Sequence, residues 1–398
     1  MASESYQHIT TDDDLKTFCE KSEGAKWIGF DTEFVSENRY RPELCLLQVA
    51  VDGDYFIVDT MTVKDLSPFW TLLVNGDHVT VAHAAREEFL FCFRASKSRP
   101  KKLFDVQLAA GMVGLEYPAS YGNLVSRLLN RTIDKGETRT DWRKRPLSQR
   151  QIDYALSDVV HLRPLYDKLD VQLNELNRTE WFADEISKWM DHLELSEIEP
   201  QWRRVSGISN LNRRALAIVR QLWLERDEEA SRQNRSPRRI LADDLIVELA
   251  KRGSSDIKRL KAIRGFENRV SKSMFERISE AIETANQLPD KELPKRLPRN
   301  QNMNLGLLGQ FLTTAINVVC RQQSIAPAIV GTANDIRKLA AWRLGMIKLD
   351  EAPELSKGWR ARMVGDVIDE VLNGTVAIRV GNPKSEMPLE LEYLSGDE

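Results

Sequence analysis

Residues 27–34 read WIGFDTEF, a short apolar run that ends in two acids, Asp31 and Glu33, with one residue between them. Residues i and i+2 of a strand point to the same side, so both carboxylates would project together from a strand that is otherwise built to be buried. Like charges that close repel each other, and desolvation adds to the cost. A divalent cation would remove this cost. The alternative is a strand end that emerges into water, where acids are common.

Four more short apolar runs follow, and they predict a sheet: LCLLQVAV (44–51), YFIVD (55–59), VTVA (79–82) and KLFD (102–105). Asp52-Gly53 lies between the first two of these runs, which is a strong signal for a tight hairpin. Helical patterns over 84–95 and 106–113 come after the later runs. We predict a mixed α/β sheet whose first three strands are antiparallel and whose later strands are joined by crossover helices.

The rest of the chain has a helical pattern. Ser148 and Gln151 form a capping-box signal at the start of one helix, and Pro164 should kink or end it. Three prolines in 289–302 predict a linker. We predict an α/β domain at 1–190 and two all-α domains at 207–288 and 303–380, with a lone strand at 375–380 and a tail at 381–398.

Composition restricts the class of protein. The 398 residues carry a net charge of −3, which counts against a passive nucleic-acid coat protein. No run reaches the roughly 20 apolar residues of a membrane helix, and the polar N-terminus does not resemble a secretory signal. The four cysteines form no C-x-x-C pair, which is typical of reduced thiols. We expect a cytoplasmic protein without a zinc site or a membrane partner.

Two further motifs carry acids. Tyr154 and Asp158 are four residues apart on a predicted helix and share one face. The segment from His83 to Glu88 follows the VTVA run. Alone, the first motif is as well explained by an exposed helical contact, and the second by acids at a helix start. Together with Asp31 and Glu33, these acids could converge at one end of the sheet and hold two hard divalent cations.

These motifs resemble those of a known family. Asp31-Thr-Glu33-Phe34, the His83-led segment and Tyr154-x-x-x-Asp158 resemble the three motifs of the tyrosine-type four-acid 3′–5′ exonucleases, which have a ribonuclease-H-like fold, and among them the ribonuclease D family. Residues 46–48, 103–109 and 141–147 support the resemblance. Residues 207–288 resemble the helical HRDC domain through Ser236–Leu241, Asp244-Leu245 and Leu260–Gly265, and 303–380 resembles a second, diverged copy.

The resemblance implies a metal-dependent 3′–5′ exoribonuclease that releases nucleoside 5′-monophosphates. It implies that Asp31, Glu33, Glu88 and Asp158 hold two Mg²⁺ or Mn²⁺ ions and that Tyr154 orients the attacking water. RNA 3′ ends, tRNA precursors in particular, are the implied substrate. A DNA 3′–5′ exonuclease is the first alternative, because the same motifs act on DNA phosphates. The sequence does not indicate an oligomeric state.

One position departs from the family pattern. The family has Asp five residues after the His, where this chain has Glu88. Three readings stay open: Glu88 still supports metal binding, Glu87 replaces it, or the enzyme is slowed or inactive. A catalytically impaired nucleic-acid-binding protein is therefore the second alternative.

Five residues are predicted to contact the substrate strand. Phe34 suits stacking on a terminal base, although core packing explains it equally well. His83 is better explained as a strand-end hydrogen-bonding residue, and Asp105 as a helix N-cap. An aromatic and basic cluster that includes Trp142, Arg143 and Arg145 precedes the helix that carries Tyr154.

Overall fold

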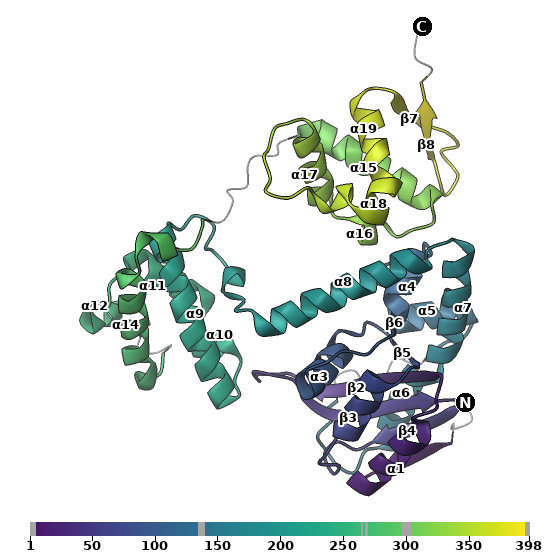
Figure 1. Cartoon of the computed structure of the whole chain (residues 1–398), viewed down its shortest axis with the longest axis horizontal. Helices are drawn as coiled ribbons and strands as arrows, with labels where there is room; N and C mark the ends of the chain where they lie inside the picture. The colour runs from purple at the N-terminus through teal and green to yellow at the C-terminus, as the bar shows by residue number, and fades with distance from the viewer. Residues whose placement is uncertain (1–4, 134–139, 264–265, 267–269, 297–304, 395–398) are drawn as a thin grey trace. The chain divides into compact units, whose positions relative to one another are not determined.

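The structure is a computed structural model that describes residues 5–133, 140–263, 266, 270–296 and 305–394 (Figure 1). The chain divides into two compact units: Met1–Glu33 with Leu46–Asp191 and Gln301–Glu398, and Phe34–Cys45 with His192–Asn300. One such unit can hold more than one domain, so the predicted domain boundaries stay predictions. Of the helices in the described ranges, none is long and apolar enough to cross a membrane.

A six-stranded mixed sheet forms the centre of the first unit, with the order β1-β4-β3-β2-β5-β6. β3 and β4 are antiparallel, whereas β1 pairs with β4, β2 with β5 and β5 with β6 in parallel. The predicted mixed sheet is confirmed. Its strands are β1 (Tyr6–Ile9), β2 (Trp27–Val35), β3 (Glu43–Val51), β4 (Asp54–Val58), β5 (Val79–Ala82) and β6 (Leu103–Asp105).

Helices cover this sheet in two groups. The first group packs side by side and contains α1 (Asp12–Ser22), α2 (Ser67–Asn75) and α3 (Arg86–Ser96). The second group contains α4 (Val106–Met112), α5 (Tyr121–Leu129), α6 (Gln149–Val160) and α7 (Leu162–Glu175). In the second group, α6 packs against β4 and α7 against β5. A sheet covered by helices in this way buries the near-continuous apolar runs of its strands.

Two local predictions are confirmed. Asp52 and Gly53 have φ values of 50° and 97°, which is the conformation that a two-residue type I′ hairpin requires. α6 ends at Val160, and Pro164 lies in the first turn of α7, where its missing N–H leaves no helical hydrogen bond unmade.

The sheet begins earlier than the sequence pattern predicts. β1 and α1 were not expected, because Tyr6–Ile9 is only four residues long and buries a single side chain, Ile9. α1 does have a sequence signal. Thr11 accepts a hydrogen bond from Asp14 N, and the buried Leu15, Phe18 and Cys19 have helical spacing.

The second unit is a helical bundle with its own apolar core, as predicted for 207–288. Its helices are α9 (Arg213–Gln233), α10 (Pro237–Ile240), α11 (Asp243–Arg252), α12 (Ile257–Lys261) and α14 (Lys272–Gln287), and α8 (Thr179–Ile198) leads into it from the first unit. Arg264 and Gly265 of the HRDC-like motif lie outside the described residues. Short 3₁₀ turns occur at Trp202–Arg204, Asp290–Glu292 and Glu354–Ser356.

An arm formed by Phe34–Cys45, which includes the end of β2, the start of β3 and the loop that joins them, belongs to this bundle. Tyr40 packs against the helical core, and its hydroxyl donates to Asp227 Oδ2 at 2.9 Å. Ser236 N donates to Asn38 O at 3.2 Å. The strand that carries Asp31 and Glu33 therefore runs directly into the helical unit.

The C-terminal region is helical and ends in a hairpin. It contains α15 (Gly306–Gln322), α16 (Pro327–Val330), α17 (Ala333–Arg343), α18 (Gly358–Arg360), a π-helical turn (Ala361–Gly365) and α19 (Asp366–Leu372). The strand predicted at 375–380 is present, but the prediction that it stands alone is wrong. β7 (Val376–Val380) pairs antiparallel with β8 (Leu389–Tyr393), so part of the predicted tail is a strand that satisfies the backbone of β7.

This region is fixed to the helices that cover the sheet within the first unit. The buried Arg178 donates to Met112 O and to Ser324 O, both at 2.6 Å. The guanidinium of Arg360 makes two hydrogen bonds, 2.7 and 2.9 Å long, to the carboxylate of Glu185. Paired, partly buried charges of this kind define one docking geometry.

Candidate active site

Three carboxylates from two distant segments meet in the first unit. Asp31 and Glu33 project from β2, and Asp158 comes from α6, which begins at the predicted capping box of Ser148 and Gln151. One carboxylate oxygen of each lies within 4.8 Å of the others. Period-two spacing on the strand places the first two acids on one face, and the helix brings the third to them.

The electrostatics of this group favour a bound cation. Burial, and then the charges of Glu88, Asp158 and Glu33, raise the pKa of Asp31 well above its usual value. Burial and the charges of Asp158 and Glu88 raise the pKa of Glu33 to about 8, and burial raises the pKa of Asp158 to about 7. Without a counter-charge, these groups keep protons near neutral pH. Three clustered carboxylate oxygens fit a hard divalent ion such as Mg²⁺ or Mn²⁺.

Glu88 lies beside this group and outside it. Its side chain is 5% exposed, and its Oε1 accepts a hydrogen bond from Thr32 Oγ1 at 2.5 Å. Thr32 lies between the two acids of β2, on the opposite side of the strand. Burial raises the pKa of Glu88 to about 7, although the Thr32 hydrogen bond opposes this rise. Glu88, the predicted fourth metal ligand, therefore raises the pKa values of Asp31 and Glu33 through its charge. Its side chain accepts a hydrogen bond from Thr32.

Glu87 has a different setting. It forms an ion pair with Arg86, and its side chain is 20% exposed. This pairing gives no support to the alternative in which Glu87 replaces Glu88 near the acids.

Shortening Glu88 tests its role. We expect Glu88→Asp to keep or raise Mn²⁺-dependent nucleotide release, because the resemblance places Asp at this position. We expect the isosteric but neutral Glu88→Gln to lower it by about 10–100-fold, as for other residues that support a metal site. Glu87→Gln is the matched control and should leave the rate unchanged. A complete loss in Glu88→Asp would mean that the site is built around the longer side chain and its bond to Thr32.

Tyr154 shares a helix face with Asp158, as its spacing predicts. Its hydroxyl hydrogen-bonds Asp158, and burial together with the neighbouring carboxylates raises its pKa. The phenol therefore stays protonated at neutral pH and can donate. The Trp142 ring, only 2% exposed, lies 6.2 Å from the Tyr154 ring, centroid to centroid.

The residues predicted to contact substrate have varied surroundings. Phe34 is partly exposed on β2. Trp142 is buried and packs near Tyr154, and its substrate contact stays a prediction. Arg143 pairs with Asp141, and Arg145 makes two hydrogen bonds of 2.6 and 2.7 Å to Asp59. Substrate contacts by Phe34, Arg143 and Arg145 stay predictions.

His83 and Asp105 have the hydrogen bonds that their positions suggest. His83 Nε2 lies 3.0 Å from Ala119 O, as expected for a strand-end hydrogen-bonding residue, and its substrate contact stays a prediction. Asp105 caps α4 by accepting from Gln107 N and Leu108 N. The N-cap prediction is confirmed.

Sequence reasoning missed two residues near the acids. Thr32, described above, could have been found from its alternate position in the DTE motif. Tyr121 is the first residue of α5 and packs edge-on against His83, with 5.5 Å between the ring centroids. Burial and the charge of Asp158 raise its pKa well above the usual value. A single tyrosine after a loop carries no sequence signal of this kind.

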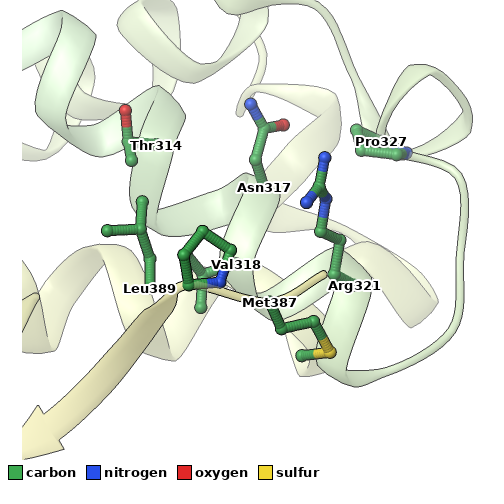
Figure 2. Close-up of a pocket in the computed structure, with 8 residues that line it drawn as sticks. Thr314, Asn317, Val318, Arg321, Pro327, Met387 and Leu389 are labelled. Atoms are coloured by element: carbon green, nitrogen blue, oxygen red, sulfur yellow. The ribbon is translucent and has the colours of Figure 1, made fainter. Parts of the chain in front are cut away.

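A separate pocket of about 420 Å³ lies in the C-terminal region (Figure 2). The residues that line it come more than 150 positions after Asp158 in the sequence. Asn317 and Arg321 of α15 present their side chains to it, above the apolar side chains of Val318 and Leu389. Its eight lining residues include no carboxylate, so they do not offer the ligands that a hard cation prefers.

Known proteins with the same architecture have been identified. A model of the 3′–5′ exonuclease domain matches residues 6–174, and a model of the HRDC domain matches residues 215–282. Ribonuclease D of Gluconacetobacter diazotrophicus is 34% identical over 389 residues, with 94% of each chain covered. Ribonuclease D of Bartonella henselae is 31% identical, with 94% of this chain and 92% of the relative covered.

A solved structure agrees with these relatives. Escherichia coli RNase D, described as an exoribonuclease involved in structured RNA processing, superposes with a TM-score of 0.77 at 25% identity and covers 93% of this chain and 99% of its own. The resemblance that the motifs indicated is confirmed, as is a ribonuclease-H-like exonuclease domain followed by helical regions. On the identity and coverage of these relatives, the chain belongs to the ribonuclease D family.

Proposed function

We propose that this chain removes nucleotides one at a time from the 3′ ends of structured RNA, tRNA precursors among them, and releases nucleoside 5′-monophosphates. The observation that carries the proposal is the group of Asp31, Glu33 and Asp158, with their oxygens within 4.8 Å of one another and Tyr154 adjacent. Clustered carboxylates of this type are found where divalent ions assist phosphoryl displacement.

Each residue has a distinct task in this mechanism. Asp31, Glu33 and Asp158 would hold two divalent cations, with Glu88 adding negative charge beside them. When bound, such ions lower the pKa of the attacking water and stabilise charge on the leaving 3′-oxygen. The Tyr154 hydroxyl donates its proton to Asp158, which fixes the direction of the phenol, and its oxygen can then orient the water by accepting a hydrogen bond from it. Trp142 packs behind Tyr154 and restricts its ring.

The helical regions suit an RNA substrate. The HRDC domain is a nucleic-acid-binding domain, and residues 215–282 match it. Arg238 and Arg239 of α10 and Lys258 and Arg259 of α12 place cations on this unit, which can neutralise phosphates of the RNA body. We propose that the bundle holds a folded RNA while its 3′ tail is shortened, and that the enzyme works in the cytoplasm.

The test uses matched RNA and DNA hairpins with identical 3′ overhangs. We expect Mg²⁺- or Mn²⁺-dependent release of 5′-monophosphates from RNA, no release with EDTA, and no release by Asp31→Ala. Equal rates on both hairpins would support a DNA or general 3′–5′ exonuclease instead. Binding without metal-dependent release would support an impaired nucleic-acid-binding protein, the alternative that the position of Glu88 motivates.

Removing the Tyr154 hydroxyl tests its role in orienting the water. We expect Tyr154→Phe to lower kcat by about 10–100-fold, because one oriented hydrogen-bonding group is lost, with the KM for RNA changed less than about threefold. Tyr166→Phe on α7, which removes a hydroxyl from a tyrosine outside the acid group, is the control and should act like wild type. A large rise in KM would indicate that Tyr154 binds substrate.

A further inference from the structure

Asp105 joins two elements that flank the acid group. It ends β6 beside Ala82, the last residue of β5, and is 6% exposed. Its Oδ1 accepts from Gln107 N at 2.8 Å and from Ala84 N at 3.0 Å, and its Oδ2 accepts from Ala85 N at 3.0 Å. The same carboxylate therefore caps α4 and holds the turn that precedes α3.

The N-cap residue of α3, Ala85, makes no side-chain capping hydrogen bond. Ala84 has a φ of 52°, a left-handed conformation that is unfavourable for a residue with a Cβ atom. Two hydrogen bonds to a buried carboxylate can offset this strain. Because α3 begins at Arg86, the position of the turn sets the position of Glu88 two residues later.

A second pair of contacts holds the start of the turn. His83 Nε2 and Gln107 Nε2 meet the same carbonyl, Ala119 O, at 3.0 and 2.8 Å. His83 directly precedes Ala84, and Gln107 directly follows the Asp105–Val106 step into α4. The start of the turn is therefore fixed to the segment before α5, and its end is fixed to the N-cap of α4.

We propose that Asp105 is a positioning residue of the metal site. It fixes the turn His83–Ala85 and so holds the Glu88 carboxylate next to Asp31 and Glu33. This inference rests on the proposed function, since it takes the acids as ligands or neighbours of divalent ions. It adds a residue outside the three exonuclease motifs to those that set the affinity of the site.

The test is Asp105→Asn, because an asparagine keeps one oxygen. With its oxygen at the Oδ1 position, Asn retains the acceptor for Gln107 N and Ala84 N, and its NH2 group faces Ala85 N, so the hydrogen bond to Ala85 N is lost. We expect the affinity for Mn²⁺, measured by titration calorimetry without RNA, to fall by about 10–100-fold. We expect kcat to fall similarly and the KM for RNA to change less than about threefold.

Asp12→Asn is the control for replacing a carboxylate that holds a distant backbone segment. Asp12 also accepts from two backbone N–H groups of a distant segment, Lys64 N at 2.6 Å and Asp65 N at 3.2 Å. We expect this variant to bind Mn²⁺ as wild type does. If it weakens Mn²⁺ binding as much as Asp105→Asn, the effect is one of general stability, and the proposal is overturned.

A double-mutant cycle decides whether Asp105 acts through Glu88. In a Glu88→Gln background, we expect Asp105→Asn to add no further loss of Mn²⁺ affinity, since there is no charge left to position. Additive losses, or wild-type affinity in Asp105→Asn alone, would overturn the proposal. If wild type itself takes up no Mn²⁺, the proposed function fails, and this result is distinct from failure of the Asp105 inference.

Discussion

Asp158→Asn is expected to lower the rate of mononucleotide release by about 10³-fold or more and to leave RNA affinity nearly unchanged. The substitution keeps the shape of the side chain and removes one negative charge from a group of three carboxylates. Charge stabilisation by divalent ions contributes several kcal/mol to such a transition state, and each ~1.4 kcal/mol is a factor of ten. Single-turnover assays with labelled RNA and filter binding measure the two quantities.

A control exists on the same helix. Asp153 is exposed, and its Oδ1 accepts from Gln149 Nε2 at 2.8 Å, near the start of α6. Asp153→Asn should stay within about twofold of wild type, as expected for an exposed surface substitution. If Asp158→Asn instead loses RNA binding and activity to the same extent, Asp158 has a role in folding, and the proposed active site is wrong.

Metal-free protein is expected to lose stability as the pH rises, and Mg²⁺ is expected to reverse this trend. Glu33 has a pKa of about 8, and Glu88 and Asp158 have pKa values of about 7. In the unfolded chain such acids titrate near pH 4. Between these values the folded state binds more protons than the unfolded state, so the free energy of unfolding falls with rising pH. We expect a fall of roughly 2–4 kcal/mol from about pH 5.5 to 8.5 in EDTA.

Saturating Mg²⁺ should stabilise the protein most at the alkaline end, where protons no longer compete for the carboxylates. Denaturant unfolding at several pH values, with EDTA or Mg²⁺, measures both slopes. Asp158→Asn should show a shallower fall in EDTA. Comparing the variant with wild type also cancels the contribution of His78 and His83 to the pH dependence of stability. Their contribution has the opposite sign, because burial lowers their pKa values. Equal slopes for the variant and wild type would show that the acids are not the cause.

The sequence predicted those features that depend on neighbours along the chain. WIGFDTEF predicted a buried strand with paired acids, Asp52-Gly53 predicted the hairpin between β3 and β4, and the spacing of Tyr154 and Asp158 predicted their shared face. Each rests on a local period or a local backbone conformation. The capping box of α6 belongs to the same class of signal.

Features that depend on distant partners were not predictable in this way. Arg145 has the composition of a substrate-binding residue, yet its partner is Asp59, 86 residues earlier in the chain. Glu88 was placed with the metal ligands by motif spacing, and only the fold shows its hydrogen bond to Thr32. β1 was missed because four residues are too few to establish a period, and β8 because the strand that it pairs with, β7, is also short.

The arm between β2 and β3 also affects how the chain can be divided for experiments. A fragment that ends near residue 190 keeps Tyr40 but loses Asp227, the acceptor of its hydroxyl. A fragment that starts near residue 207 keeps Asp227 but loses the aromatic ring that covers part of its core. RNA affinities measured on such halves would describe surfaces that the intact polypeptide does not expose, so domain-by-domain dissection of this nuclease is best done by point substitution.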